Sequence, residues 1–217
     1  TSTPTRPHQR GNNQVWEGLV LVGEDRNVSA VFDDLRGSTV QGYYSPGTDE
    51  IVIVSDAATP RLSRGTLVHE LVHALQDQQF GLNGSMDTQD GQLAHSGVVE
   101  GEANLLTARY GGQCEAEWSC VTVPGGDGGG GGLSSPGVFA VIYQPYATGP
   151  GFVAALEQRG GWDAVDDAHA EYPASSEQVI HPERYPDDEP VDVTVPDRST
   201  AAWDRFDHDP VADTVGE

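Results

Sequence analysis

Hydrophobic spacing divides the chain into a short β-rich part followed by a series of helical segments. Residues 40–44 and 50–55 are rich in β-branched and aromatic side chains, and the intervening residues 45–49, Ser-Pro-Gly-Thr-Asp, have the composition of a turn. This pattern predicts a β-hairpin. Before it, residues 15–22 are apolar without a clear period, and residues 30–36 suit either a short helix or a short strand.

The segment after the hairpin has a helical period. Leucine and alanine recur there at intervals of three and four, and neither Pro nor Gly occurs from residue 66 to residue 80. Gly81 comes next, at a place where a helix can end. We expect residues 66–80 to form a helix that buries one apolar stripe, made of Leu67, Leu71, Ala74 and Leu75.

Further helices are predicted along the rest of the chain. The helix expected at residues 90–110 should end at the pair Gly111-Gly112, and the segment 137–146 should be helical as far as Pro145. Ser175 and Gln178 match a capping box, which predicts a helical turn beginning there. The expected helices before that turn cover residues 90–110, 137–146, 151–159 and 162–170.

The predicted fold class is α+β, with a small antiparallel hairpin and several helices. A chain of 217 residues suits one domain, which we place at residues 15–195. Residues 1–14 are polar and are expected to form a flexible arm, and the acidic residues 196–217 a C-terminal segment. The glycine-rich residues 121–135 are predicted to be a solvated insertion.

The order of polar residues in the predicted helix at 66–80 suggests a metal-binding site. His69 and His73 are four residues apart, so a helix places both imidazoles on one face, where they can bind one metal ion. A zinc ion accepts such nitrogens at about 2.0–2.1 Å. Glu70 follows the first histidine directly, and in this HExxH pattern the glutamate acts as general base on water bound to zinc. The pattern therefore predicts a hydrolytic zinc site.

A catalytic zinc site takes three protein ligands, so a third must come from elsewhere in the chain. Suitable side chains are those of His95, Glu100, Glu102 and His181. We favour Glu100, because it adjoins Gly101, which allows close approach of two helices. Glu102 points about 200° away around the same helix and is expected to be a solvated surface carboxylate. Asn104 lies on the face of Glu100 and is expected to hydrogen-bond a ligating histidine.

The charge composition indicates the setting of the protein. The chain carries 34 acidic and 11 basic side chains, a net charge of −23, and all the basic residues are Arg. At 1 M salt the Debye length is about 3 Å, so repulsion among the carboxylates is screened. We infer a halophilic protein with an extracellular or cell-surface location; an acidic secreted protein of a mesophile is the alternative, against which the absence of Lys counts. Such a surface repels nucleic acid, which we exclude as a partner.

The remaining motifs concern cysteine, membranes and surface histidines. Cys114 and Cys120 suit a short disulfide in an oxidising compartment, which we expect, or two free thiols. No run of about 20 apolar residues occurs, so no membrane span is expected. Three histidines, His8, His169 and His208, lie among polar residues and are expected at the surface. The oligomeric state is not defined by the sequence.

The residues HELVH at 69–73, followed by EGEAN at 100–104, resemble the gluzincin branch of zinc metallopeptidases. Later segments are similar to a group that includes surface proteins of haloarchaea, namely those at residues 146–149, 161–162 and 175–185. The resemblance extends from residue 40 to residue 185. It implies a zincin-like domain with a pair of active-site helices, one zinc ion per chain and Glu100 as third ligand. Asn104 stands where the family has Asp, so a lower ligand basicity is expected.

Hydrolysis of a peptide bond also needs a donor to the oxyanion that develops in the transition state. The candidates are His181, Tyr185 and Tyr146, and His181 is favoured because a capping box before it and Pro182 after it would fix its position. The predicted catalytic residues are therefore Glu70, His181 and Tyr185, acting on a peptide or protein substrate. Two alternatives stay open: a surface binding protein that keeps zinc without turnover, and a zinc hydrolase of a non-peptide amide or ester.

Overall fold

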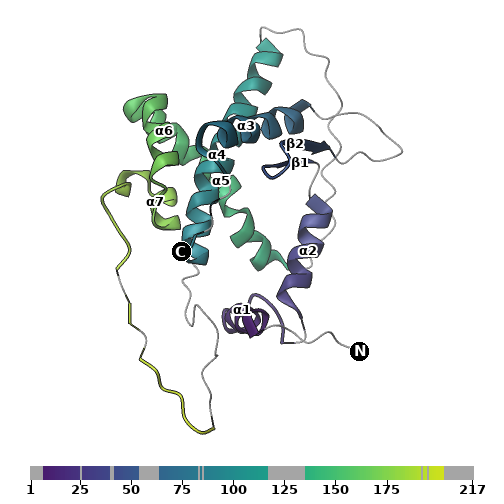
Figure 1. Ribbon diagram of the computed structural model, residues 1–217, viewed down its shortest axis with the longest axis vertical. Helices are drawn as coiled ribbons and strands as arrows, with labels where there is room; N and C mark the ends of the chain where they lie inside the picture. Colours follow the sequence, from purple (N-terminus) through teal and green to yellow (C-terminus); the bar gives the residue numbers. More distant parts are fainter. Residues whose placement is uncertain are drawn as a thin grey trace.

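The computed structural model describes residues 7–24, 26–39, 42–53, 64–82, 84, 86–116, 135–191, 193–194 and 196–202. Within these residues the chain is mostly helical with one two-stranded antiparallel sheet, so the predicted α+β class is confirmed. The helices are α1 (Pro7–Gly18), α2 (Val28–Thr39), α3 (Arg64–Phe80), α4 (Gln89–Ala116), α5 (Pro136–Gly160), α6 (Trp162–Ala170) and α7 (Ser176–Ile180), and the strands are β1 (Gly42–Ser45) and β2 (Glu50–Ile53) (Figure 1).

The N-terminal helices α1 and α2 pack around a buried tryptophan. Trp16 is fully buried, edge-on to Phe32 with ring centroids 5.6 Å apart, and the same cluster includes Val138 at the start of α5. Residues 7–14 are helical, where the sequence predicted a flexible arm. Their polar composition does not predict a helix. The helix is stabilised by tertiary packing of one large side chain near its end, Trp16.

The open assignment of residues 30–36 is resolved in favour of a helix. They belong to α2, whose N-terminus is capped by Asn27. Asn27 Oδ1 accepts hydrogen bonds from the backbone N–H groups of Ser29 at 2.9 Å and Ala30 at 3.4 Å. A cap of this kind satisfies donors that the first turn of a helix otherwise leaves without partners, and so favours the helix over a strand.

β1 and β2 form the predicted hairpin, which lies beside α3 (Figure 1). The register places Tyr44 opposite Ile51 and Ser45 opposite Glu50. The hydroxyl of Tyr44 donates to Oδ2 of Asp77 on α3 at 2.9 Å. This hydrogen bond ties the strand to the helix that carries the HExxH pattern.

α3 begins and ends close to the predicted bounds, but it buries a different face. It ends before Gly81, whose φ of +75° is the left-handed conformation common after a helix. The predicted leucine stripe is wrong, because Leu71 is 51% exposed and Leu75 is 58% exposed. The helix turns its polar face toward α4 instead, and the side chains it buries are Glu70, Val72, His73 and Gln76.

α4 continues through the glycine pair at which the sequence predicted its end. It is helical to Ala116, beyond Gly111 and Gly112. Both glycines are exposed, so no buried contact is lost there. A glycine in a helix costs only about 1 kcal/mol relative to alanine, and two of them are tolerated when no proline follows.

α5 is one helix through two prolines, although the sequence predicted a break at Pro145. A proline leaves the carbonyl four residues earlier without its helical donor. Pro150 has this effect on the carbonyl of Tyr146, and Asn104 of α4 donates to that oxygen from its side-chain nitrogen at 3.4 Å. Contact with α4 therefore compensates for the missing helical hydrogen bond.

α4 and α5 cross with their backbones in direct contact (Figure 1). A Cβ at Gly101 would lie 2.4 Å from the carbonyl carbon of Gly149, and a Cβ at Gly149 would lie 2.3 Å from the carbonyl oxygen of Gly97. Gly101 was expected to allow a close approach of helices, and the helix that approaches here is α5. Because Glu100 adjoins Gly101, this contact also fixes the position of Glu100.

We predict that Gly149→Ala lowers the free energy of unfolding by about 3 kcal/mol, because the methyl group would force two backbones apart. Chemical denaturation measures this change. Gly151→Ala is the matched control, since it lies in the same helix and a Cβ there meets no atom within 4 Å. It should raise the free energy of unfolding by about 0.5–1 kcal/mol. Similar effects of the two substitutions would contradict the described packing.

α6, α7 and the 3-10 turn η1 (Pro182–Arg184) pack against α4 and α5. Ser175 is the N-cap of α7, but its side chain makes no capping hydrogen bond. Gln178 instead accepts from the N–H of Ala174 at 2.7 Å. Its amide nitrogen donates to the carbonyls of Pro186 and Asp188. The predicted helical turn is therefore present, and the predicted capping box is not. The shared core contains Ala94, Val98, Phe152, Val153, Leu156, Val165, Ala168 and Val179.

Two further expectations concern a membrane span and a disulfide. Among the helices that the described residues form, none combines the length and the apolar character needed to cross a membrane. Cys114 lies near the end of α4, while Cys120 and the glycine-rich insertion up to residue 134 lie outside the described residues. The disulfide between Cys114 and Cys120 therefore stays a prediction.

Candidate metal centre

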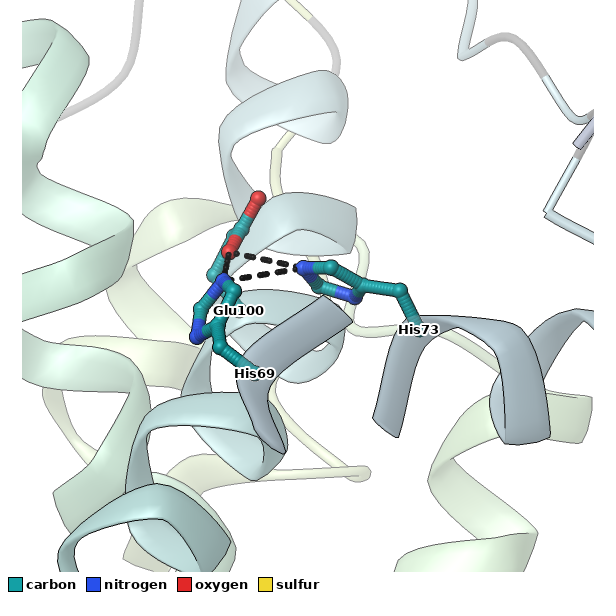
Figure 2. A group of neighbouring side chains, drawn as sticks. All are labelled: His69, His73 and Glu100. Carbon is teal, nitrogen blue, oxygen red and sulfur yellow. Dashed lines mark hydrogen bonds and ion pairs between the residues drawn. The ribbon is translucent and has the colours of Figure 1, made fainter. Parts of the chain in front are cut away.

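Three side chains from α3 and α4 converge on one point, as Figure 2 shows. Nε2 of His69 lies 3.0 Å from Nε2 of His73 and 3.1 Å from Oε2 of Glu100. Nε2 of His73 lies 3.3 Å from the same carboxylate oxygen. The two imidazole rings are perpendicular, with an interplanar angle of 90°, so that their nitrogens meet while the rings stay apart.

These separations suit one metal ion. Ligand atoms about 2.0–2.1 Å from a tetrahedral zinc ion lie about 3.3 Å from one another. The three atoms are 3.0, 3.1 and 3.3 Å apart. Two imidazole nitrogens and a carboxylate oxygen are also donors that transition-metal ions accept. His69, His73 and Glu100 could therefore hold a metal ion.

Glu100 is held from the side opposite the histidines. The hydroxyl of Tyr146 on α5 donates to Oε1 of Glu100 at 2.9 Å, while Oε2 faces His69 and His73. Burial alone would raise the pKa of Glu100, but the hydrogen bonds with His69 and His73 outweigh burial and lower the pKa to about 2. Glu100 is thus a carboxylate at neutral pH, which is the form that binds metal.

Stacked rings along α5 fix the direction of the Tyr146 side chain. The ring of Tyr143 stacks on that of Tyr146, with centroids 5.0 Å apart. Phe139 stacks in turn on Tyr143, with centroids 4.8 Å apart. Aromatic stacking of this kind limits rotation of the ring, so the Tyr146 hydroxyl is held toward Glu100.

Gln76 orients the second histidine. Its Oε1 lies 2.9 Å from Nδ1 of His73, and its Nε2 donates to the carbonyl of Val99 at 3.0 Å and to the carboxylate of Glu102 at 2.8 Å. Two acceptors face the amide nitrogen, so the amide cannot be turned round without opposing oxygen to oxygen. The amide oxygen therefore faces His73, which donates from Nδ1 and keeps the lone pair of Nε2 for a metal ion.

The sequence analysis did not identify Gln76. A signal was available, because Gln76 follows His73 by three residues and so lies on the metal-binding face of α3. A buried glutamine at that position can only hydrogen-bond the histidine or the neighbouring helix. The structure shows that it does both.

Glu70, the predicted general base, is buried on α3 with an exposed fraction of 5%. Its carboxylate accepts a hydrogen bond from the backbone N–H of Tyr44 in β1, so the hairpin helps to position it. Burial raises the pKa of Glu70, and the nearby histidines His73 and His69 oppose that shift. Glu70 adjoins His69 on α3, and the charges of both histidines and of Glu100 influence the pKa of its carboxyl group.

Asn104 does not have the predicted role. It was expected to hydrogen-bond a ligating histidine, but its side-chain nitrogen donates to the carbonyl of Tyr146 instead. The cause is Pro150, which leaves that carbonyl without a helical donor. Asn104 therefore contacts the backbone of α5 at Tyr146, the residue whose hydroxyl donates to Glu100.

His181 and Tyr185 are not brought to the metal-binding group. Nδ1 of His181 lies 3.7 Å from the carboxylate of Glu183, and the His181 side chain is 41% exposed. The hydroxyl of Tyr185 donates to the carbonyl of Glu171 at 2.7 Å, and its ring packs edge-on against Phe152 in the core. Of the three predicted oxyanion donors, Tyr146 is the one whose hydroxyl contacts a candidate metal ligand, Glu100.

Two residues predicted at the surface are in the interior. Glu102 has a side chain 12% exposed, and its Oε2 lies 2.8 Å from Nε2 of His169 as well as 2.8 Å from Nε2 of Gln76. The ring of His169 is fully buried and stacks on Phe80, with centroids 4.4 Å apart. α6 brings His169 to Glu102 across 67 positions of sequence, which no local pattern reveals.

His95, which the sequence offered as a possible third ligand, is buried against Tyr172 and is not part of the metal-binding group.

A cavity of about 230 Å³ adjoins the metal-binding group. His73 and Glu100 form part of its wall, so the cavity lies next to both. Apolar and uncharged polar side chains make up much of the remainder, including Tyr44, Leu82, Ser96 and Val99. His95 also lines the cavity, and burial, followed by the charge of His169, lowers its pKa and favours the neutral ring.

Comparison of the chain with protein-family models, with curated proteins and with solved structures finds no match. The interpretation of the site therefore depends on its own geometry and chemistry. What the described residues establish is a group of two histidines and one glutamate that could hold a metal ion.

Proposed function

We propose that the chain is a zinc-dependent hydrolase of peptide bonds. The observation that carries the proposal is the convergence of His69 and His73 on α3 with Glu100 on α4, whose ligand atoms lie within 4.8 Å of one another. The same helix α3 also carries Glu70. Two imidazole nitrogens and one carboxylate oxygen, with a further position left for water or substrate, are the ligands of a class of catalytic zinc sites. The resemblance of residues 69–73 and 100–104 to gluzincins supports the same proposal.

Each residue of the site has a chemical role in this proposal. A zinc ion held by His69, His73 and Glu100 would supply a Lewis acid, which polarises the substrate carbonyl and lowers the pKa of metal-bound water to about 7. Glu70 takes a proton from the attacking water and passes it to the leaving amine, while the N–H of Tyr44 holds its carboxylate in place. Tyr146 first holds Glu100 and then donates its hydroxyl proton to the oxyanion in a hydrogen bond.

The lining of the cavity supports a proposal about the substrate side chain beside the scissile bond. Its wall combines the apolar groups of Leu82 and Val99 with the uncharged polar groups of Tyr44 and Ser96. An uncharged side chain can enter it without loss of hydration that no protein group replaces. We therefore propose a peptide with an apolar or neutral side chain at that position.

Hydrolysis of an unstructured protein by the purified, zinc-loaded chain tests the function. Incubation with a reduced and alkylated polypeptide should release fragments, which mass spectrometry identifies. A chelator should stop the reaction, and added zinc should restore it. A chain that binds zinc and leaves the polypeptide intact, in low and in molar salt, would contradict the proposal and would favour a binding protein that retains the metal.

Replacing the third ligand is predicted to remove the metal. In Glu100→Gln the neutral amide no longer compensates the charge of zinc, so zinc affinity should fall by more than the roughly 10–100-fold typical of a residue that only supports a ligand. Zinc per chain after dialysis is the measurement. Glu157→Gln is the control, because that carboxylate pairs with Arg109 between α4 and α5 away from the site. Full zinc content in Glu100→Gln would show that Glu100 is not a ligand.

Tyr146→Phe distinguishes two roles of one hydroxyl. If the hydroxyl donates to the oxyanion, kcat at saturating zinc should fall by about 10²–10³-fold, and KM should change little. If it only holds Glu100, zinc affinity should fall and kcat should recover when zinc is saturating. The proposed mechanism predicts the first result. Steady-state kinetics over a series of zinc concentrations provides the measurement.

A further inference from the structure

A largely buried carboxylate outside the metal-binding group, that of Glu102, connects α3 to α6. Oε2 of Glu102 lies 2.8 Å from Nε2 of Gln76 on α3 and 2.8 Å from Nε2 of His169 on α6. The His169 side chain is fully buried, and that of Glu102 is 12% exposed. A carboxylate in such surroundings is stable only if its hydrogen bonds are made, and the proposed hydrolysis does not use it.

We propose that Glu102 is a positioning residue for the metal site, which fixes the Gln76 amide and through it the orientation of His73. The inference rests on the proposed function, because it assigns Glu102 a part in zinc binding. The chain of contacts is continuous: Glu102 accepts from Nε2 of Gln76, and Oε1 of Gln76 accepts from Nδ1 of His73. Nε2 of His73 is thereby aimed at Glu100 and His69.

Glu102 gives the amide a stronger acceptor than the backbone does. The carbonyl of Val99 also accepts from Gln76, at 3.0 Å, but the charged carboxylate accepts at 2.8 Å. Hydrogen bonds to a charged group are about twice as strong as those between neutral groups. Loss of Glu102 therefore leaves Gln76 with its weaker partner and with an amide N–H that has no acceptor.

His169 holds the carboxylate from the other side. Its Nε2–H donates to Oε2 of Glu102, and its ring stacks on Phe80 with an interplanar angle of 1°. Phe80 is the last residue of α3, so α6 touches the metal helix both at its end and, through Glu102, near His73. A histidine predicted at the surface is thus linked to His73 by three successive contacts, through Glu102 and Gln76.

Glu102 is not itself a ligand in this arrangement. The group that could hold a metal ion contains His69, His73 and Glu100 and does not include Glu102. Both neighbours of Oε2 are donors, Gln76 and His169, and a metal ion at that oxygen would have to displace them. The distinction matters for the test, because a ligand and a positioning residue respond differently to a conservative change.

Zinc dissociation constants of the full chain test the proposal, measured at one pH and one salt concentration by competition with a chromophoric chelator. Glu102→Met keeps the length of the side chain and removes the acceptor, and we expect its dissociation constant to rise by about 10–100-fold. Glu102→Gln keeps one oxygen that can accept from both Gln76 and His169, so we expect a rise of no more than about threefold. Glu157→Met, the matched control, loses its pair with Arg109 and should bind zinc like the wild type.

The outcomes separate the inference from the function. If the wild type binds no zinc, the proposed function fails and the inference fails with it. If the wild type binds zinc and Glu102→Met binds it within twofold, the inference alone is overturned. If Glu102→Gln loses zinc as completely as Glu100→Gln, Glu102 is a ligand and the inference is also overturned.

A second measurement distinguishes a local effect of Glu102→Met on His73 from a general loss of stability. The Nδ1–H proton of His73 in the zinc-loaded protein should be visible by nuclear magnetic resonance and should exchange slowly, because Gln76 accepts it. In Glu102→Met it should exchange at least tenfold faster, while backbone amides of α4 keep their rates. If Glu102→Met does not fold, His169→Phe replaces it, since that change keeps the stack on Phe80 and removes the donor to Glu102, together with the Nδ1 atom that lies 3.4 Å from the Tyr172 hydroxyl. We expect the zinc dissociation constant of His169→Phe to rise by about three- to tenfold, and an unchanged constant overturns the proposal.

Discussion

Replacement of Glu70 by Gln is expected to lower kcat by about 10²–10⁴-fold, the usual contribution of a general base. The amide keeps the size of the side chain and can still accept the N–H of Tyr44, so the local structure should persist. It cannot take a proton from water. Zinc content should stay at the wild-type level, because the three candidate ligands are untouched. Initial rates at saturating zinc, together with metal analysis of the same sample, measure both quantities.

Glu50→Gln is the control for this change. Glu50 is an exposed carboxylate on β2, in the hairpin that contacts Glu70, and its loss removes the same charge without touching the site. It should keep full activity. A Glu70→Gln protein that retains more than a tenth of kcat would show that another group accepts the proton, and the mechanism given to Glu70 would be wrong.

The second large effect concerns salt. We predict that the melting temperature rises by about 10 °C or more between 0.1 M and 2 M KCl, because the Debye length shrinks from about 10 Å to less than 3 Å and repulsion among the acidic groups is screened. α6 illustrates the repulsion, since Asp163, Asp166 and Asp167 are exposed on one short helix. Thermal unfolding followed by circular dichroism is the measurement. A steep dependence would support the inference that the protein works in high salt.

The triple variant Asp163→Asn, Asp166→Asn and Asp167→Asn separates screening from other effects of salt. It removes three like charges from α6 and leaves Val165 and Ala168 in the core. Its melting temperature should be higher than that of the wild type in low salt and closer to it in high salt. A melting temperature of the wild type that stays flat across the salt series would refute the halophilic interpretation.

The metal-binding group was predictable because its geometry is mostly local. A helix fixes the distance between residues four apart, so His69 and His73 follow from the sequence once α3 is recognised. Glu100 required a further argument, that the glycine beside it permits close helix packing. The hairpin was predictable for the same local reason, since its turn composition and its strands are adjacent in the chain.

The contacts by which Tyr146 and His169 support the site could not be predicted, because they join distant parts of the chain. Tyr146 and Glu100 are 46 positions apart, and His169 and Glu102 are 67 apart. Such contacts depend on how α4, α5 and α6 cross, and periodicity within one segment contains no information about crossing. The leucine stripe of α3 was wrong for a related reason. Hydrophobic spacing predicts which face would be buried by apolar contact alone, whereas α3 buries the face that carries its polar network.

The backbone contact between Gly101 and Gly149 has a consequence for how the molecule can be divided. Both helices meet there without an intervening side chain, and the chain between them runs through residues 117–134. The three candidate zinc ligands all precede that connection, and Tyr146 follows it. A split at the connection would yield one fragment with the three candidate ligands and another with Tyr146, which the proposed mechanism makes the oxyanion donor. Hydrolysis by the mixed fragments would then report reassociation of α4 with α5, as in a protein-complementation assay.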